Sequence, residues 1–174
     1  MSEWLPEMVC VNPWTACTFE KLYDIFCREI RDQKPVYKGN EVWIFPELEE
    51  NKELIFWHLT TRKEREKSIP RRKLKFCQKD QPFVDMERLP DFRRCERLSW
   101  VNAVIEHADS PVVINWDYEE SDGTVKTYLW HKDEDFVVIM KKYPDGKRRL
   151  VTSFYVDSDY KRRDFERKYA NRIK

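Results

Sequence analysis

Short apolar runs separated by turn residues dominate the C-terminal half of the chain. Strands are predicted over residues 112–118, 125–130, 136–142 and 148–156. Two of the connectors contain Asp122-Gly123 and Asp145-Gly146, pairs that favour tight turns. Because short turns join antiparallel neighbours, this pattern predicts a four-stranded meander sheet.

Helical spacing of apolar residues appears before and after these strands. Helices are predicted over residues 15–31, with Thr15 or Thr18 as N-cap, over 92–107, and over 159–174, where Ser158 can act as the cap. The first two carry apolar stripes: Phe19, Leu22, Phe26 and Ile30 in one, and Cys95, Leu98, Val101, Ile105 and Ala108 in the other. Each stripe is able to pack one side of its helix against a sheet.

The segments between the first two helices follow weaker patterns. Residues 41–45 predict a short strand. Residues 54–61 have strand-favouring side chains but run into a basic stretch that favours helix, so both states stay open. Prolines in residues 68–91 predict a long loop, with an extended piece near 74–76.

These elements together predict an α+β fold. N-terminal helices should pack on a four-stranded antiparallel meander sheet, and a C-terminal helix should close the structure. We expect a helical segment over residues 1–40 and a domain over residues 41–174, joined in one compact unit.

The net charge of +1 conceals a strong segregation of charge. Lys and Arg gather in residues 62–75 and 160–174, whereas Glu gathers in residues 41–53, a division that favours an anionic partner such as nucleic acid. The simpler alternative is a solvated charged surface. Five cysteines without a CxxC pair indicate reduced thiols in a cytoplasm. No apolar run is long enough for a membrane span, and no phosphate-binding glycine motif is present, so neither a membrane partner nor a cofactor is expected.

His58 is the main candidate for catalysis. In a strand, His58, Thr60 and Arg62 share a face; in a helix, His58 and Arg62 share one. Either arrangement sets a proton shuttle beside a permanent cation, which is what metal-free phosphodiester cleavage needs. The alternative is a structural histidine among aromatic residues.

Further candidates come from the last strand, the second helix and the last helix. Alternation assigns Leu150, Thr152, Phe154 and Val156 to one face of the strand, and Val151, Ser153 and Tyr155 to the other. Arg94 and Arg97 share a helix face and are able to clamp phosphates, and Lys161 and Arg162 begin a basic helix that can follow a nucleic-acid backbone. Ordinary packing and solvated surfaces are the alternatives. His131, beside Asp133, Glu134 and Asp135, is expected at a solvated hairpin tip, not in a metal site, and His107 near a helix C-terminus.

The order of these elements resembles phage-encoded nucleases of the barnase, EndoU, colicin and RelE-like group, which share the BECR fold. The resemblance spans residues 53–172. It rests on His58 with residues 60–62, on 94–97 with Trp100, Val101, Ile105 and Glu106, on 128–130, 135–138 and 150–156, and on 161–163 with Lys168 and Tyr169.

The resemblance implies metal-independent endoribonuclease chemistry of a toxin-like type, encoded by a phage or mobile element and acting in the host cytoplasm. The ribose 2′-hydroxyl attacks the adjacent phosphorus and leaves a 2′,3′-cyclic phosphate. His58 would act as base or acid and Arg62 would stabilise the phosphorane. Thr152, with Ser153 or Tyr155, would complete the catalytic set. Substrate-binding positions would be Thr60, Thr61, Arg94, Arg97, Lys161 and Arg162.

The implied partners are a tRNA or other structured RNA and a cognate immunity or phage protein. One departure is that the group often has Thr-x-Tyr on the last strand, whereas here Phe154 lies two positions after Thr152. This departure favours an alternative, a non-catalytic RNA- or protein-binding module of the same fold. Another alternative is a metal-dependent nuclease that uses Asp133, Glu134 or Asp135.

Overall fold

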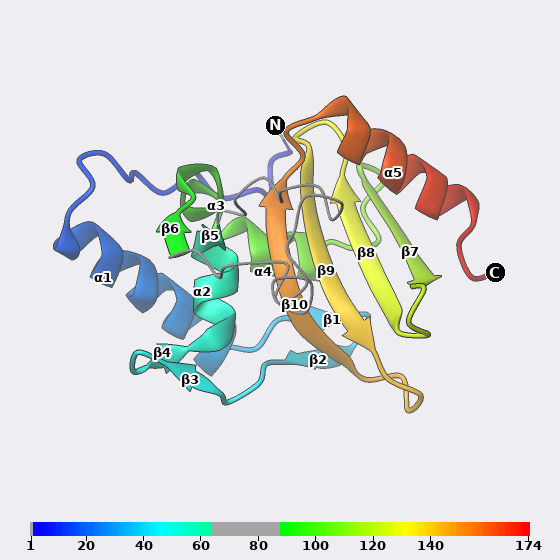
Figure 1. Cartoon of the computed structure of the whole chain (residues 1–174), viewed down its shortest axis with the longest axis horizontal. Helices are drawn as coiled ribbons and strands as arrows, with labels where there is room; N and C mark the ends of the chain where they lie inside the picture. Colours follow the sequence, from blue (N-terminus) through cyan, green and yellow to red (C-terminus); the bar gives the residue numbers. More distant parts are fainter. Residues whose placement is uncertain (1, 64–87) are drawn as a thin grey trace, which may run out of the picture.

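The computed structural model describes residues 2–63 and 88–174, which form an α+β structure around one curled, mixed sheet (Figure 1). The sheet has six strands in the order β1-β2-β10-β9-β8-β7. They are β1 Val36–Tyr37, β2 Asn40–Trp43, β7 Val113–Glu119, β8 Val125–His131, β9 Phe136–Lys142 and β10 Arg148–Tyr155. The last four strands form an antiparallel meander.

The prediction of a four-stranded antiparallel sheet is wrong. The β1–β2 hairpin extends the sheet, and β2 pairs parallel to β10, with Val42 opposite Arg148 and Trp43 opposite Arg149. An unpaired edge strand exposes backbone donors and acceptors, and β2 covers part of that edge of β10. Sequence patterns predict the strand in this region but carry no signal for a pairing that spans about a hundred residues.

Five α-helices are described. They are α1 Ala16–Phe26, α2 Leu54–Thr60, α3 Phe92–Glu96, α4 Trp100–Glu106 and α5 Asp159–Ala170. A π-helical segment, Cys27–Asp32, continues α1. The side chain of Thr15 caps α1 by accepting from the N–H of Thr18 at 3.2 Å, and Ser158 caps α5, so both predicted caps are confirmed.

Two helix predictions need revision. The single helix predicted over residues 92–107 is α3 followed by α4, because Arg97 leaves helical geometry at φ −106° and ψ 18°. The ambiguous segment 54–61 is helical up to Thr60. Packing decides this outcome: Ile55, Phe56 and Leu59 recur at helical spacing and all three are buried.

Two small hairpins lie beside α2. One joins β3 Leu48–Glu49 to β4 Lys52–Glu53, and the other joins β5 Thr61–Lys63 to β6 Arg88–Pro90. The extended piece predicted near residues 74–76, and most of the loop predicted over 68–91, lie outside the described residues. The described end of that loop, Arg88–Pro90, is strand β6.

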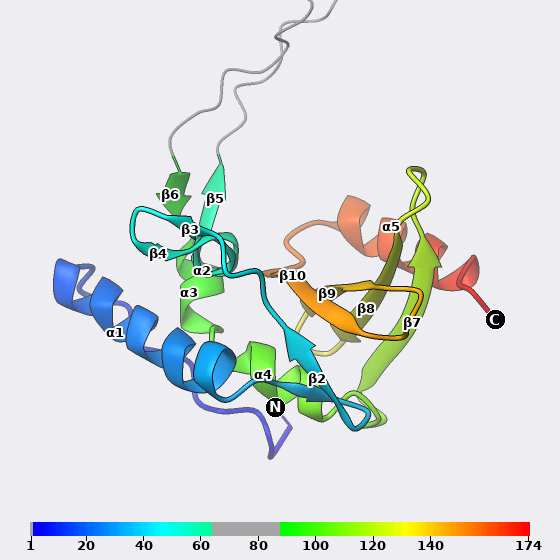
Figure 2. The same ribbon diagram turned by 90° about the horizontal axis from the view of Figure 1, so that it is seen from below.

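The sheet separates two apolar cores (Figure 2). The larger core packs α1, α2, α3 and α4 against one face and includes Phe26, Phe56, Trp100 and Val138. The smaller core packs Phe165 of α5 against the other face, with Trp130 and Val137.

No helix in the described ranges combines the length and the apolar character that a membrane crossing requires.

A β-bulge interrupts the alternation of β10. Leu150 pairs with Met140 and Thr152 pairs with Ile139, so Val151 is an extra residue. Because paired residues share a face, Leu150 lies with Ser153 and Tyr155 on the face of the larger core, opposite Thr152 and Phe154. The predicted placement of Leu150 with Thr152 is therefore wrong, whereas the separation of Ser153 from Thr152 holds.

The Phe56→Ala substitution should lower the free energy of unfolding by about 3–5 kcal/mol, because it leaves a large cavity in the core. Phe56 is fully buried, and its ring centroid lies 5.1 Å from that of Tyr23 and 5.4 Å from those of Phe19 and Phe26. Urea denaturation measures the loss. Leu48→Ala is the control, since Leu48 is 61% exposed, and it should change stability by no more than about 0.5 kcal/mol. Equal effects of the two substitutions would contradict the packing of α2.

Candidate functional site

The guanidinium of Arg94 in α3 joins this helix to α2 and β10. We call the place where these three elements meet the corner. Its Nη1 donates to the carbonyl oxygen of His58 at 2.8 Å and to Oγ1 of Thr152 at 3.4 Å. The Thr152 hydroxyl donates to the same carbonyl at 3.3 Å. Three residues predicted separately from the sequence are thus in direct contact.

Asp91 holds Arg94 in place. Its side chain caps α3 by accepting from the Arg94 N–H at 3.3 Å, and its Oδ2 lies 3.4 Å from Arg94 Nε. Burial lowers the pKa of Arg94, and the Asp91 carboxylate opposes that shift. Since the usual pKa of arginine is about 12.5–13.8, the group keeps its charge at neutral pH.

An open pocket of about 490 Å³ adjoins this contact. We call it the arginine–tyrosine pocket; it is lined by Arg62, Pro90, Asp91, Phe92, Arg93, Tyr155 and Asp157. The guanidinium carbons of Arg93 and Arg97 lie 4.9 Å and 5.1 Å from the centroid of the Tyr155 ring. Cations stacked on a phenol ring form a platform with a flat aromatic surface and positive charge.

The two carboxylates of this pocket already have cationic partners. Asp157 accepts from Nζ of Lys161 at 2.8 Å, which holds the pKa of Asp157 below its usual range, and Asp91 is paired with Arg94. Within residues 2–63 and 88–174, no carboxylate forms an ion pair with Arg62 or Arg93, and both side chains are exposed. Toward the described part of the chain, the positive charges of these two arginines are therefore not paired with a carboxylate.

The imidazole of His58 lies in a different cavity. It is partly buried and lines a space of about 100 Å³ with Phe45, Arg149 and Val151, which we call the His58 cavity. Burial, and then the nearby charge of Arg88, lowers the pKa of His58, while a hydrogen bond with the backbone of Val151 opposes the shift. The ring is therefore mainly neutral at pH 7 and able to accept a proton.

The prediction that His58 and Arg62 share a face is wrong. The helix ends at Thr60, and Thr61 has extended geometry, so the chain turns away before Arg62. The two side chains line the two separate cavities. Along β10, the His58 cavity touches Val151 and the arginine–tyrosine pocket touches Tyr155, so Thr152 lies between them.

Several predicted site residues are occupied by structural contacts. The hydroxyls of Thr60 and Thr61 donate to the carbonyls of Phe56 and Trp57 at 2.8 Å and 2.6 Å, and both threonines are buried. Ser153 is buried as well. The hydroxyls of Thr60 and Thr61 therefore hold the fold, and none of the three residues lines the arginine–tyrosine pocket.

The cationic site residues predicted on the helices fall into two groups, near the arginine–tyrosine pocket and away from it. Arg97 donates to the carbonyl of Arg93 at 3.1 Å and stacks on Tyr155, so it supports the arginine–tyrosine pocket. Lys161 pairs with Asp157 at the pocket's rim. Arg162 instead binds Asp135 and Asp159, away from the corner.

Asp91, Asp157 and Arg149 were missed by the sequence reasoning. Asp91 precedes an apolar-periodic segment, the position of a helix N-cap, and this signal was sufficient to find it. Asp157 and Arg149 have no local signal, because their places depend on how β10 meets α2 and α3. The described residues contain no group of three or more His, Cys, Asp or Glu side chains suited to one metal ion.

The remaining histidines pack against the N-terminal segment. Nε2 of His131 lies 3.0 Å from Oγ of Ser2, and the ring of Trp4 stacks on His107 at 4.4 Å between centroids. His131 is buried, and it lies in this contact and not in a solvated hairpin tip. His58 is thus the histidine that lines a cavity at the candidate site.

Comparison with protein-family models, with curated proteins and with solved structures found no match to this chain. No family is assigned on that basis.

Folding stability should decrease in mild acid. Burial lowers the pKa of His58 and of His131 below the usual histidine value of about 6.5. The unfolded chain then binds protons at a higher pH than the folded chain, so the free energy of unfolding should fall as the pH drops from about 6.5 toward the folded-state pKa values.

Two measurements check this prediction. NMR titration of the imidazole resonances should give midpoints below about 6.5 for both rings, and urea unfolding at pH 7.5 and 5.5 should give the stability loss. The His58→Gln variant should lose part of the pH dependence. A His58 midpoint at or above the usual value would contradict the burial described here.

Proposed function

We propose that this protein is a metal-independent endoribonuclease whose scissile phosphate binds beside Arg94 and Thr152. The observation that carries the proposal is the contact of Arg94 with both the His58 carbonyl and the Thr152 hydroxyl, next to a pocket lined by Arg62 and Arg93. A tRNA or another structured RNA is the proposed substrate, and a cognate immunity or phage protein the proposed partner.

Positive charge is the first requirement of phosphodiester cleavage, and this corner supplies it. Arg62 and Arg93 would bind the phosphate oxygens, and Arg94 would oppose the negative charge that grows on the phosphorane. The planar guanidinium of Arg93, stacked on the ring of Tyr155, offers a surface on which a neighbouring base would stack.

Proton transfer is the second requirement. A neutral imidazole of His58 would take the proton of the 2′-hydroxyl as that oxygen bonds to phosphorus. The bond from phosphorus to the 5′-oxygen then breaks, and the Tyr155 hydroxyl would protonate the leaving oxygen. The products are a 2′,3′-cyclic phosphate and a 5′-hydroxyl end, and exchange with water restores both side chains.

A second function, RNA binding without cleavage, is favoured by one observation. The imidazole of His58 bonds with the backbone of Val151 and lines a cavity other than the arginine–tyrosine pocket. In this reading the arginines and Tyr155 hold a strand, and His58 is a packing residue. The two functions differ in whether a product forms.

Purified protein should cleave total tRNA and rRNA in EDTA and leave 2′,3′-cyclic phosphate ends. His58→Ala should lower the cleavage rate by about a hundredfold or more, because general base catalysis contributes about 10²–10⁴-fold. Arg62→Ala should raise KM, because that residue binds phosphate. Product ends are mapped by sequencing, and rates by gel electrophoresis.

The matched control is Arg167→Ala, which removes an exposed α5 arginine paired with Asp164 at 2.6 Å. It should leave both rate and KM unchanged. Intact RNA with a salt-dependent gel shift would contradict the nuclease proposal and favour RNA binding without cleavage. Cleavage unaffected by His58→Ala would show that His58 has no part in the mechanism.

A further inference from the structure

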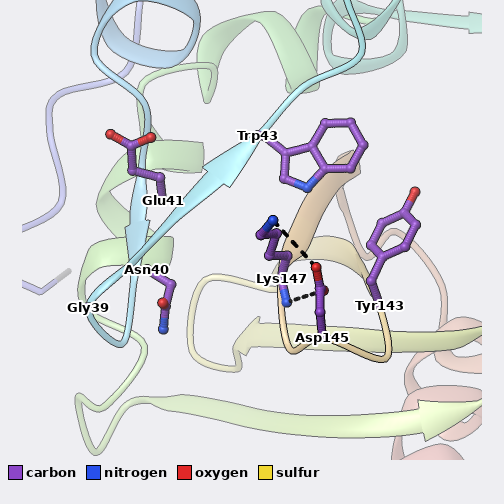
Figure 3. A pocket seen from close by; sticks show the side chains of 7 residues that line it. All are labelled: Gly39, Asn40, Glu41, Trp43, Tyr143, Asp145 and Lys147. Atoms are coloured by element: carbon purple, nitrogen blue, oxygen red, sulfur yellow. Dashed lines mark hydrogen bonds and ion pairs between the residues drawn. The ribbon is translucent and has the colours of Figure 1, made fainter.

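An open cavity of about 630 Å³ lies at the opposite end of β10 from the arginine–tyrosine pocket. Two hairpins enclose it: residues 39–41 and Trp43 come from β1–β2, and Tyr143, Asp145 and Lys147 from the connection of β9 and β10 (Figure 3). Gly39 and Gly146 have φ values of +82° and +84°, which allow both tight turns. We call this space the Trp43 cavity.

The wall of the Trp43 cavity is aromatic. The rings of Trp43 and Tyr143 lie 5.6 Å apart between centroids and are tilted by 35°. Nε1 of Trp43 is buried and has no hydrogen-bond partner within the described ranges. Figure 3 shows this edge of the indole turned toward Lys147 and Asp145, while the carboxylate of Glu41 points the other way. An unsatisfied buried donor costs free energy, which a ligand with an acceptor atom would recover.

A cation stands at the mouth of the cavity. Lys147 pairs with Asp145 at 3.5 Å, but their side chains are 72% and 54% exposed. Exposed ion pairs contribute little, so this pair would open for a stronger anion at small cost. A flat apolar wall, a free N–H donor and an accessible ammonium fit a nucleotide, which presents a planar base, ring acceptors and a phosphate.

Cationic and aromatic side chains connect this cavity with the catalytic corner. Arg149 is the register partner of Trp43, and its guanidinium carbon lies 3.9 Å from the ring centroid of Phe45. Phe45 and Arg149 line the His58 cavity, whose lining includes Val151, the residue before Thr152. The seven residues from Arg149 to Tyr155 cover about 20 Å of strand, long enough for several nucleotides of an extended chain.

We propose that the Trp43 cavity is a base-stacking subsite, which holds a nucleotide of single-stranded RNA several positions from the scissile phosphate. The strand would pass from β2 to β10, over Phe45 and Arg149, with Trp43 as the stacking surface. This inference rests on the proposed function, since it places the same RNA at a second point on the protein. The protein would then select RNA that is single-stranded and long enough to reach from the scissile phosphate to the Trp43 cavity.

The test uses a fluorescein-labelled, mixed-sequence 2′-O-methyl RNA of twelve nucleotides, which cannot be cleaved through its 2′-oxygen. Anisotropy gives its Kd for the full-length protein. Trp43→Leu and Tyr143→Leu should each weaken binding roughly tenfold, the contribution of one stacked base. Both replacements keep apolar volume, and two independent variants guard against a local folding defect, which circular dichroism would reveal.

Salt dependence separates the two sites. Trp43→Leu should leave the slope of log Kd against log salt unchanged, because stacking releases no counterions, whereas Arg62→Ala should reduce that slope by about one phosphate contact. Tyr160→Ala is the control, since Tyr160 is 81% exposed on α5 and lines neither the Trp43 cavity nor the arginine–tyrosine pocket, and it should leave Kd unchanged.

The outcomes separate this inference from the proposed function. Weaker binding by Arg62→Ala alone, with both aromatic variants at the wild-type Kd, would overturn the subsite and leave the catalytic corner standing. Weaker binding by the aromatic variants alone would support the subsite and remove the arginines from RNA binding. No binding of the RNA by the wild-type protein would overturn both.

Discussion

The carbonyl groups at the C-terminal end of α2 are the constraint on which this corner of the molecule depends. The last four carbonyls of an α-helix have no partners within it, and a buried one left unsatisfied costs about 1–3 kcal/mol. Here the carbonyl of His58 accepts from Arg94 and Thr152, and that of Thr60 accepts from the Asp91 N–H at 2.9 Å. With seven residues, α2 has few hydrogen bonds of its own, so these tertiary bonds decide where it ends and what it meets.

A buried arginine is a costly solution to that constraint, and its surroundings show how the cost is offset. The negative end of the α2 dipole faces the guanidinium of Arg94, and the Asp91 carboxylate lies 3.4 Å from it. Asp91 also caps α3, so one side chain starts a helix and holds the cation. The positions of the His58 carbonyl and the Thr152 hydroxyl relative to the positive charge are consequently set by the fold itself.

Local patterns predict local structure in this chain, and they fail where the outcome depends on distant partners. The four C-terminal strands and the caps Thr15 and Ser158 follow from alternation and capping, which act within a few residues. The parallel pairing of β2 with β10 and the bulge at Val151 depend on how β10 meets its two neighbouring strands in the sheet. Likewise, individual candidate residues such as Arg94 and Tyr155 are predictable from the chemistry of their side chains. The hydrogen bonds from the Thr60 and Thr61 hydroxyls to helix carbonyls, in contrast, are predictable only when the end of α2 is known.

The nearly neutral net charge of +1 is compatible with a strongly anion-attracting corner because the carboxylates near it are already paired. Asp91 is bound to Arg94 and Asp157 to Lys161, so neither carboxylate forms an ion pair with Arg62 or Arg93 in the part of the chain that the structure describes. Stacking on Tyr155 holds Arg93 beside the pocket before any ligand binds, which reduces the side-chain entropy lost on binding. Affinity at this corner is therefore governed by the arrangement of a few paired and unpaired charges, and the total charge of the chain is a poor guide to it.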